Sequence, residues 1–556
     1  MSRFSERSHK VWATCDKCGK FPTEFVPLNH PISEQFHFRT VTANEVQAIL
    51  MSIPSNKSPG HDKIPIKVYK DCLSSILPSI THFINISLSS SVFPTAWKIA
   101  EVVPIPKTDD YELANNNRPI SLLPVLSKVC ERVVHKQVDS YLIFKDRLAS
   151  TQSGNKRHHS TETSIIHSND FILNAMDNKK LTASVFLDMS KAFDSLNHDL
   201  LIKKLRHTGL SSQAILWFQS YLSFRYQRVR INSSLSDLLP VSTGVPQGSI
   251  LGPLLFSVYV NDLPLSLKKC EVDSYVDDTK MYLSFNVKDK DISITDLQQD
   301  LTSIRNWCFN NSLLINPDKT KLIVFGTKQM LSRLDDFKLS LLGKGLTPCD
   351  SVRDLGVYVD SQLSYDKHVS KTVSSCVSRL CQINRVKHVF DKRTLKLVIN
   401  ALVFSRLFYC SSVWSNTAKK NVDKLQLVQN FAARIVANKR KYEHVTPILR
   451  SLNWLPVRDE LYFRDAVLAF KCMSGLAPVY LSDKLITRST VSKRETRNSQ
   501  MLNIPLFRTA TGQKTFYYRT VNIWNNLNND IKLCIDVNSF RSKLRGVLLD
   551  KFKREE

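Results

Sequence analysis

Two adjacent carboxylates, Asp277 and Asp278, lie between two short runs of apolar, aromatic and β-branched residues. These runs, residues 272–276 and 279–283, favour two strands joined by a tight acidic turn. Adjacent carboxylates at such a turn repel each other unless a cation lies between them, and a divalent metal ion is the usual cation. Taken alone, the pair favours an ordinary surface turn, because Asp is a common turn residue and short motifs often arise by chance.

Another carboxylate, Asp188, follows a run of β-branched and aromatic residues at 183–187. The run predicts a buried strand, and a carboxylate at the end of such a strand is held rigidly enough to serve as a metal ligand. Asp188 and Asp277, on separate strands, could jointly bridge two Mg²⁺ ions about 3.5–4 Å apart. Such ions lower the pKa of an attacking hydroxyl and neutralise charge on a leaving pyrophosphate, so the two aspartates point to phosphoryl transfer.

A glycine-rich segment, residues 244–256, lies between these acidic elements in the chain. The whole protein has only 14 glycines, and their concentration here indicates a backbone that turns tightly or approaches another molecule. In its middle, Gln247 carries an amide that both donates and accepts hydrogen bonds. A plain loop that enters the apolar helix predicted at 254–262 is the alternative interpretation.

The elements that must position these residues follow an α/β pattern, since residues 181–360 alternate short apolar strands with helices. After about residue 365 the chain changes to longer amphipathic segments with few strand signals. Residues 421–437, for example, carry one apolar stripe at helical spacing. Basic clusters at 439–441 and 493–494 punctuate this half of the chain.

The length of 556 residues suggests roughly three to four domains, and a hydrophobic content of 42% supports packed cores. Lys and Arg number 77 and Asp and Glu number 50, which gives a formal net charge of +27. A charge this large and positive indicates a polyanionic partner, most simply nucleic acid, with an anionic membrane surface as the competitor. No apolar run approaches the roughly 20 residues that a bilayer span needs, so we expect no membrane partner.

The 12 cysteines are scattered and lie mostly in apolar stretches, which fits reduced thiols in an intracellular protein. Cys15 and Cys18 have the spacing of half a zinc site. Because no second pair with ligand spacing follows, a structural zinc ion is not expected there.

In this order the elements resemble the reverse transcriptases of non-LTR retrotransposons, which are LINE-type elements, and especially the jockey-like group. The resemblance covers about residues 45–470, and so many motifs in one order reverse the interpretation of the acidic turn. The motifs that carry it are residues 57–62, 117–124, 186–194, 244–256, 275–278, 315–321, 355–357, 453–458 and 475–478.

The resemblance implies an α/β fold with an α+β palm and with helical fingers and thumb, in the right-hand polymerase architecture. It divides the chain into a lead-in at 1–44, fingers and palm at 45–358 with a core at about 87–358, a helical thumb at 359–445, and a basic, mostly α-helical C-terminal region at 446–556.

The activity that the resemblance implies is RNA-directed DNA polymerisation, in which deoxynucleotides are added to a primer 3′-hydroxyl on an RNA template. Asp188, Asp277 and Asp278 would be the catalytic carboxylates that bind the metal ions. Lys319 would donate a proton to pyrophosphate, because a positioned acid helps the leaving group.

Further roles carry over from the same motifs. The ring of Phe193 would lie under the sugar and exclude a 2′-hydroxyl, and the primer end would be held by a grip. The nucleotide-binding residues would be Lys156, Phe193, Gln247 and Gly248, and the primer grip would be Leu355, Gly356 and Val357.

The implied cofactor is a pair of Mg²⁺ ions, which Mn²⁺ can replace. The implied partners are an RNA template, a DNA primer, the RNA–DNA duplex and dNTPs, with a helical thumb that grips the duplex through its shape and phosphates. Target-site copying implies an intracellular protein that works in the nucleus after passing through the cytoplasm.

The chain also departs from the family pattern. The family has an aromatic residue and an arginine where this chain has Asn155 and Lys156, so the charge is kept but the bidentate fork is lost. Arg157 could substitute if the loop shifts. Val276 replaces the commoner Ala, and no endonuclease domain precedes the polymerase region, so we expect a fragment of a longer polyprotein.

Two other functions compete with the polymerase. One is a catalytically weakened or inactive nucleic-acid-binding relic, which the altered loop at 155–156 favours and the intact aspartates oppose. The other is a group II intron maturase, which shares the polymerase motifs, although the jockey-like residues around 453–458 argue against it.

Overall fold

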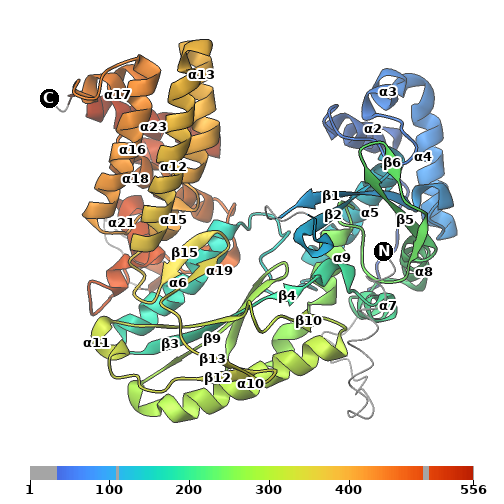
Figure 1. Ribbon diagram of the computed structural model, residues 1–556, viewed down its shortest axis with the longest axis horizontal. Coiled ribbons are helices and arrows are strands. Elements are labelled where there is room, and N and C mark those ends of the chain that lie inside the picture. The colour runs from blue at the N-terminus through green and yellow to red at the C-terminus, as the bar shows by residue number, and fades with distance from the viewer. Residues whose placement is uncertain (1–33, 108–111, 492–499, 555–556) are drawn as a thin grey trace. The chain divides into compact units, whose positions relative to one another are not determined.

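The computed structural model describes residues 34–107, 112–491 and 500–554, which form two compact units (Figure 1). Unit 1 consists of the described residues within 1–152, 188–268 and 299–316, and unit 2 of those within 153–187, 269–298 and 317–556. The expectations for Cys15, Cys18 and the basic cluster at 493–494 lie outside the described residues.

Unit 1 is built on a sheet with the strand order β2-β1-β5-β6, in which β7 also pairs with β5. Strands β1 and β2 are antiparallel, whereas β1 and β5 are parallel, with Val102 opposite both Ser121 and Val229. The strands are β1 (Ile99–Pro106), β2 (Asn117–Leu122), β5 (Arg225–Ile231), β6 (Ser234–Leu235) and β7 (Leu239–Val241). A separate two-stranded pair joins β4 (Met189–Ser190) to β10 (Leu314–Ile315).

Helices surround this sheet, and an aromatic cluster centred on the fully buried Trp217 packs them together. The Trp217 ring is stacked on that of Tyr221 at 5.7 Å and meets the edge of Phe93 at 5.5 Å. The helices are α2 (Ala43–Ser52), α3 (Ile66–Asp71), α4 (Leu73–Ser90), α5 (Val125–Phe144), α7 (His198–His207), α8 (Ser212–Leu222) and α9 (Gly252–Tyr259).

Unit 2 contains an antiparallel sheet with the order β11-β3-β9-β8. Its strands are β3 (Leu181–Leu187), β8 (Glu271–Tyr275), β9 (Asp278–Phe285) and β11 (Lys321–Phe325). Helix α6 (Thr161–Asp177) packs along β3 and β8 and covers one face of the sheet (Figure 1). Helix α10 (Lys290–Asn310) crosses the boundary between the units in the chain.

Two small hairpins follow, β12–β13 (Leu339–Leu341, Lys344–Leu346) and β14–β15 (Ser351–Asp354, Val357–Asp360). The rest of unit 2 is mainly helical, and most of its buried apolar side chains join those of α6 and the sheet in one extended core. A second cluster, which includes Phe463, Phe470 and Phe540, packs its last helices together. The helices named below are α12 (Asp366–Val386), α13 (Lys392–Ile399), α14 (Ser405–Leu407), α15 (Ser411–Trp414), α16 (Lys419–Ala437), α17 (Thr446–Leu452), α18 (Val457–Met473), α19 (Val479–Ser482), α21 (Phe516–Asn526) and α23 (Val537–Arg554).

The helices and sheets confirm the mixed α/β content of the predicted fold class, while the right-hand architecture stays a prediction. The predicted strands at 183–187, 272–276 and 279–283 are all present. The helix expected at 254–262 is α9, which ends earlier, at Tyr259. The divisions expected at 45–358, 359–445 and 446–556 stay predictions, as do the names fingers, palm and thumb. In the described part of the chain, no helix combines the length and the apolarity of a membrane span.

Candidate active site

The acidic pair lies at the tip of the β8–β9 hairpin, as the sequence predicts. Tyr275 pairs with Asp278, the first residue of β9, so Val276 and Asp277 form the two-residue turn. Val276 has φ +62°, a left-handed conformation that is a genuine outlier for a β-branched residue. Backbone strain of this kind costs about 1–3 kcal/mol and persists only where the surrounding structure holds it.

Gly154 is the neighbour that holds this turn. A Cβ atom at Gly154 would lie 2.4 Å from the backbone nitrogen of Val276 and 2.5 Å from its Cγ2, so only glycine fits. The preceding residue, Ser153, donates its backbone N–H to the carbonyl of Ser274 at 2.8 Å. Close packing against the acidic turn therefore explains why position 154 is a glycine.

Strand register brings Asp188 to the same end of the sheet as the acidic turn. Leu187, the last residue of β3, pairs with Thr279 of β9. Asp188 is the residue after Leu187 and Asp278 is the residue before Thr279, so both aspartates lie at one end of the β3–β9 pair. The carbonyl of Asp188 accepts a hydrogen bond from the backbone N–H of Asn316 at 2.8 Å.

Lys319 belongs to the same end of the sheet. It lies two residues before β11, whose first residue, Lys321, pairs with Phe186 near the end of β3. The Lys319 side chain is exposed, and the neighbouring Asp318 is ion-paired with Lys344 at 2.8 Å. Among the described residues, no group of three or more His, Cys, Asp or Glu side chains is already gathered around a metal-sized space.

The glycine-rich segment packs against two other motifs of unit 1. Gly244 has φ +78°, and a Cβ there would lie 2.7 Å from the Cα of Asp194. Gly248 has φ +120°, and a Cβ there would lie 2.8 Å from the carbonyl oxygen of Ser121. Ser121 in turn donates its backbone N–H to the carbonyl of Gln247 at 2.7 Å. Both glycines are required by close approach as well as by left-handed φ.

The Gln247 side chain is oriented by Asp194. Its Nε2 atom donates to both carboxylate oxygens of Asp194, at 2.9 and 3.1 Å. Burial raises the pKa of Asp194, while the hydrogen bond from Gln247 acts in the opposite direction. The ring of Phe193, one residue earlier, is stacked on that of Phe256 at 4.7 Å. Phe193, Gln247 and Gly248 thus belong to one packed region of unit 1.

Glu131 of α5 anchors the same segment, and sequence analysis did not single it out. The fully buried Glu131 carboxylate accepts the backbone N–H groups of Ile250 and Leu251 at 2.7 and 3.2 Å and the hydroxyl of Ser127 at 2.9 Å. Burial raises its pKa, which the backbone hydrogen bonds and Arg225 oppose. The sequence did offer one signal for Glu131, because a carboxylate on the apolar face of a predicted helix is unusual and points to a buried partner.

The predicted primer grip forms the turn between β14 and β15. Leu355 and Gly356 both have positive φ, +43° and +94°, and form the turn itself. Tyr409 holds it, because its hydroxyl donates to the carbonyl of Leu355 at 2.9 Å, and a Cβ on Gly356 would lie 3.0 Å from its ring. Val357 opens β15 and is fully buried, so Leu355 and Gly356 supply the turn's surface.

A buried polar network lies in unit 2 behind the acidic hairpin. The Lys280 ammonium is 2.8 Å from the carboxylate of Asp354 and 2.7 Å from the hydroxyl of Ser168. On the next strand, Asp273 accepts the Tyr282 hydroxyl at 3.0 Å. Burial raises the pKa of Asp273 to about 6, against the attraction of Lys280. Neither Lys280 nor Asp354 was singled out from the sequence, although a lysine between apolar strand residues was visible.

The predicted site residues therefore fall into two groups, one in each unit. Unit 1 contains Asp188, Phe193, Gln247 and Gly248, and unit 2 contains Lys156, Asp277, Asp278, Lys319, Leu355, Gly356 and Val357. Lys156 follows Asn155, which has φ +59°, in the loop between Gly154 and α6.

The part of the chain that carries these motifs is similar to known proteins. The family described as "Reverse transcriptase (RNA-dependent DNA polymerase)" matches residues 105–359. The "Probable RNA-directed DNA polymerase from transposon BS" of Drosophila melanogaster is 30% identical over 446 residues, 78% of this chain and 49% of that protein. The "RNA-directed DNA polymerase from mobile element jockey" of the same species is 27% identical over 447 residues, 78% of this chain and 48% of that protein.

A third relative, the "Probable RNA-directed DNA polymerase from transposon X-element" of Drosophila melanogaster, is 27% identical over 425 residues. That alignment covers 75% of this chain and 46% of the relative. The chain thus spans about half the length of the curated relatives that it matches.

Proposed function

Because this chain belongs to the reverse transcriptases of non-LTR retrotransposons, we propose that it is an RNA-directed DNA polymerase that extends a primer along an RNA template. The observation that carries the proposal is the β3–β9 register, in which Leu187 opposite Thr279 brings Asp188 and Asp278 to one end of the sheet. Carboxylates held close together on neighbouring strands can bind the metal ions that assist in-line phosphoryl transfer.

The proposed reaction joins the primer 3′-oxygen to the α-phosphorus of a deoxynucleoside triphosphate. The bond between the α-phosphorus and the bridging oxygen breaks, and pyrophosphate leaves. Lys319, at the same end of the sheet as the aspartates, is proposed to give a proton to that pyrophosphate. Phe193, braced by Phe256, is proposed to lie beneath the sugar and to exclude a ribose 2′-hydroxyl.

Divalent metal ions fit the proposed catalytic residues. Asp188, Asp277 and Asp278 offer only carboxylate oxygens, which are the ligands that Mg²⁺ prefers, and Mn²⁺ accepts the same donors. Two Mg²⁺ ions bound there would lower the pKa of the primer hydroxyl and neutralise charge on the leaving group. The strained turn at Val276, held by Gly154, keeps Asp277 in place before any ligand binds.

The remaining proposals concern the substrates. Lys156 and the segment around Gln247 are proposed to bind the incoming nucleotide, and Leu355 and Gly356 to hold the primer end. The RNA–DNA duplex is proposed to lie against the helices after residue 365, whose positive charge suits its phosphates. Work in the nucleus, as target-site copying implies, is part of the same proposal.

Primer extension on poly(rA) with an oligo(dT) primer and dTTP, with and without Mg²⁺, tests the function. We expect extension that depends on Mg²⁺ and that Asp277→Asn abolishes while duplex binding survives. Asp237→Asn removes an exposed carboxylate outside the proposed site and is the matched control. Normal extension by Asp277→Asn would refute the assignment, and duplex binding without any extension by the unaltered chain would identify a relic instead.

A further inference from the structure

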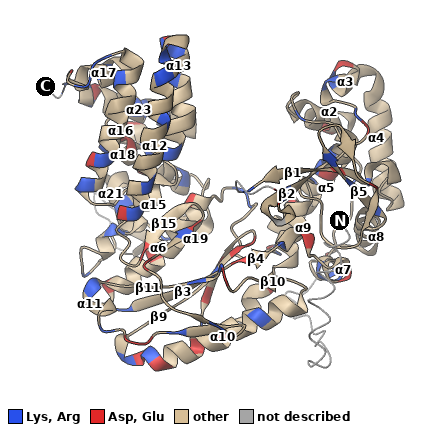
Figure 2. Ribbon diagram, viewed as in Figure 1, with Lys and Arg blue, Asp and Glu red and all other residues tan. Residues whose placement is uncertain are grey.

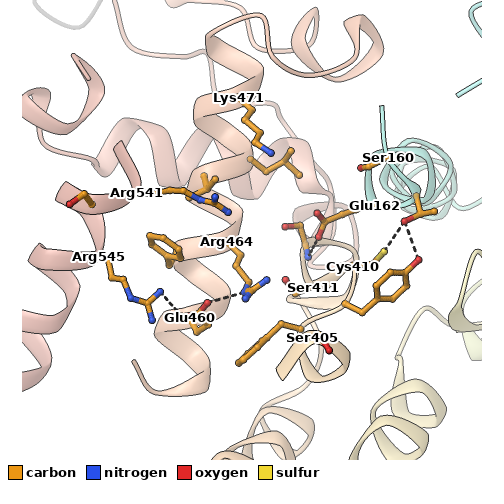
Figure 3. Close-up of a pocket in the computed structure, with 18 residues that line it drawn as sticks. Ser160, Glu162, Ser405, Cys410, Ser411, Glu460, Arg464, Lys471, Arg541 and Arg545 are labelled. Carbon is orange, nitrogen blue, oxygen red and sulfur yellow. Dashed lines mark hydrogen bonds and ion pairs between the residues drawn. The ribbon is translucent and has the colours of Figure 1, made fainter. Parts of the chain in front are cut away.

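A pocket of about 710 Å³ lies within unit 2 (Figure 3). Four segments line it, namely the start of α6 at 160–162, residues 405–412, α18 and α23. A volume of this size is in the range of pockets that enclose whole ligands, and none of the proposed catalytic or nucleotide-binding residues lines it.

The pocket is basic. Helix α18 contributes Arg464 and Lys471, and α23 contributes Arg541 and Arg545. In Figure 3, Arg464, Lys471 and Arg541 extend toward the middle of the pocket. Lys and Arg are spread over the helices of unit 2 in general (Figure 2), but here four of them line one cavity.

Two of the arginines are ordered by contacts within the protein. Glu460 is ion-paired with Arg464 at 2.9 Å and with Arg545 at 3.3 Å. Each guanidinium also lies over an aromatic ring, Arg464 over Phe408 at 4.7 Å and Arg545 over Phe463 at 5.3 Å. Such stacking fixes the guanidinium plane and leaves its edge available to an anion.

The other two cations are available to a ligand. Within the described residues, no ion pair or hydrogen bond engages the side chain of Lys471 or that of Arg541. The second carboxylate of the pocket, Glu162, already accepts the backbone N–H of Ser412 at 2.8 Å. Burial raises the pKa of Glu162, which favours its neutral form. The carboxylates therefore leave the pocket with positive charge and with donors to spare.

The spacing of the cations suits a row of phosphates better than a single one. Arg464 and Lys471 lie about 10 Å apart along the axis of α18, at 1.5 Å per residue. One nucleic-acid strand advances by about 3.4 Å per phosphate in a duplex and by more when extended. The distance of about 10 Å between the two cations therefore spans about two or three phosphates. The hydroxyl of Ser542 adds a neutral donor to the same lining.

Tyr409 supplies a surface for a base at the edge of the pocket. Its side chain is 39% exposed although its hydroxyl is held by hydrogen bonds to Leu355 and Thr161. An exposed aromatic ring beside a basic groove is the usual arrangement for sequence-tolerant binding of single strands.

We propose that this pocket binds a single strand of nucleic acid through successive phosphates, next to the proposed primer grip that Tyr409 holds. Lys471 and Arg541 contact the phosphates directly, and the stacked Arg464 and Arg545 hold the strand in register. Binding here requires neither a dNTP nor a metal ion, so the proposal stands or falls independently of polymerisation.

The test is the binding of a short fluorescent oligonucleotide, oligo(rU) or oligo(dT), to the full chain in EDTA and without dNTPs, followed by anisotropy. Lys471→Gln with Arg541→Gln removes the two available cations. Lys553→Gln with Arg554→Gln is the matched control, because it removes one Lys and one Arg from exposed positions at the end of α23, outside the pocket.

We expect the pocket variant to bind about tenfold more weakly at moderate salt, and the control to bind as the unaltered chain does. The slope of log K against log salt should become shallower by about 1.4, since each single-strand phosphate contact contributes about 0.7. Equal losses in the two variants would overturn the proposal, as would displacement of the oligonucleotide from the pocket by dTTP alone at equal phosphate concentration.

Discussion

Lys280 and Asp354 form a buried ion pair that joins the two turns of the proposed active site in unit 2. Their charged atoms are 2.8 Å apart, and the side chains are 7% and 9% exposed. Lys280 follows Asp278 by two residues on β9, and Asp354 directly precedes the Leu355–Gly356 turn. The pair therefore ties the acidic hairpin to the proposed primer grip.

Breaking that pair should cost both stability and primer use. Lys280→Met leaves the Asp354 carboxylate buried without its partner, and a broken buried pair costs about 3–5 kcal/mol. Urea unfolding would measure the loss of stability. In steady-state extension, the variant should raise the KM for the primer more than the KM for dTTP. The double variant with Asp354→Leu should lose less stability than the sum of the single variants, and strict additivity would contradict the coupling.

Gly154→Ala should disable the acidic turn. The new methyl group would lie 2.4 Å from the backbone nitrogen of Val276, so the turn must move. A displacement of about 1 Å at a reacting group can lower kcat about 10²-fold, and we expect a loss of that order in primer extension.

Val276→Ala separates the two contacts that the new methyl group would make. It removes the Cγ2 atom but leaves the backbone nitrogen in place, so it should not rescue Gly154→Ala. Full activity of Gly154→Ala would contradict this prediction, because it would show that the turn can accommodate the methyl group without moving.

Glu131→Ala should loosen the glycine-rich segment. The substitution leaves the backbone N–H groups of Ile250 and Leu251 without their acceptor. A buried donor without a partner costs about 1–3 kcal/mol. We expect a lower free energy of unfolding and a higher KM for dTTP, because Gln247 lies three residues before Ile250. Glu131→Gln keeps an acceptor oxygen and should be milder, and equal effects of the two variants would argue for simple loss of packing.

His368 should make the stability of the chain fall in mild acid. Burial lowers its pKa from 6.5 to about 4, and its Nδ1 accepts the backbone N–H of Tyr358 at 3.3 Å. Between pH 6.5 and 4, His368 is protonated in the unfolded chain but neutral in the folded chain. The contribution of His368 to stability is therefore complete above pH 6.5 and declines as the pH falls toward 4. The decline amounts to at most about 3 kcal/mol.

Urea unfolding across this pH range is the measurement. His368→Asn keeps an acceptor for Tyr358 but does not titrate, so the difference in stability between it and the unaltered chain should shrink or change sign as pH falls. A constant difference from pH 4 to 7 would rule out His368 as the titrating group.

We expect the loop at Asn155 and Lys156 to determine how tightly the incoming nucleotide binds. Asn155→Phe with Lys156→Arg restores the aromatic residue and the bidentate fork of the family motif. If the departure weakens nucleotide binding, KM for dTTP should fall in the double variant while the primer KM stays unchanged. An unaltered KM for dTTP would indicate that Arg157 already takes the place of the family's arginine. In that case Arg157→Gln should raise the KM for dTTP.

Local patterns in the sequence were enough to predict many of the secondary-structure elements. The β-branched run at 183–187 and the runs around Asp277 are strands because alternation and β-propensity are local properties. Motif order placed the acidic and glycine-rich segments in one family, and the comparisons agree. Chain positions such as Gly248 were recognisable as sites where a backbone approaches another group.

Only the tertiary structure decided which groups meet across long stretches of chain. Glu131 caps the segment at 250–251, Tyr409 holds Leu355, and Lys280 is paired with Asp354, and none of these contacts has a spacing that a local pattern encodes. The reason is physical, because burial makes an unpartnered charge costly, yet which partner satisfies it depends on packing between elements. The sequence motif was enough to single out Asp277 and Asp278. The glycine that packs against their turn and the ion pair behind it became visible only in the folded chain.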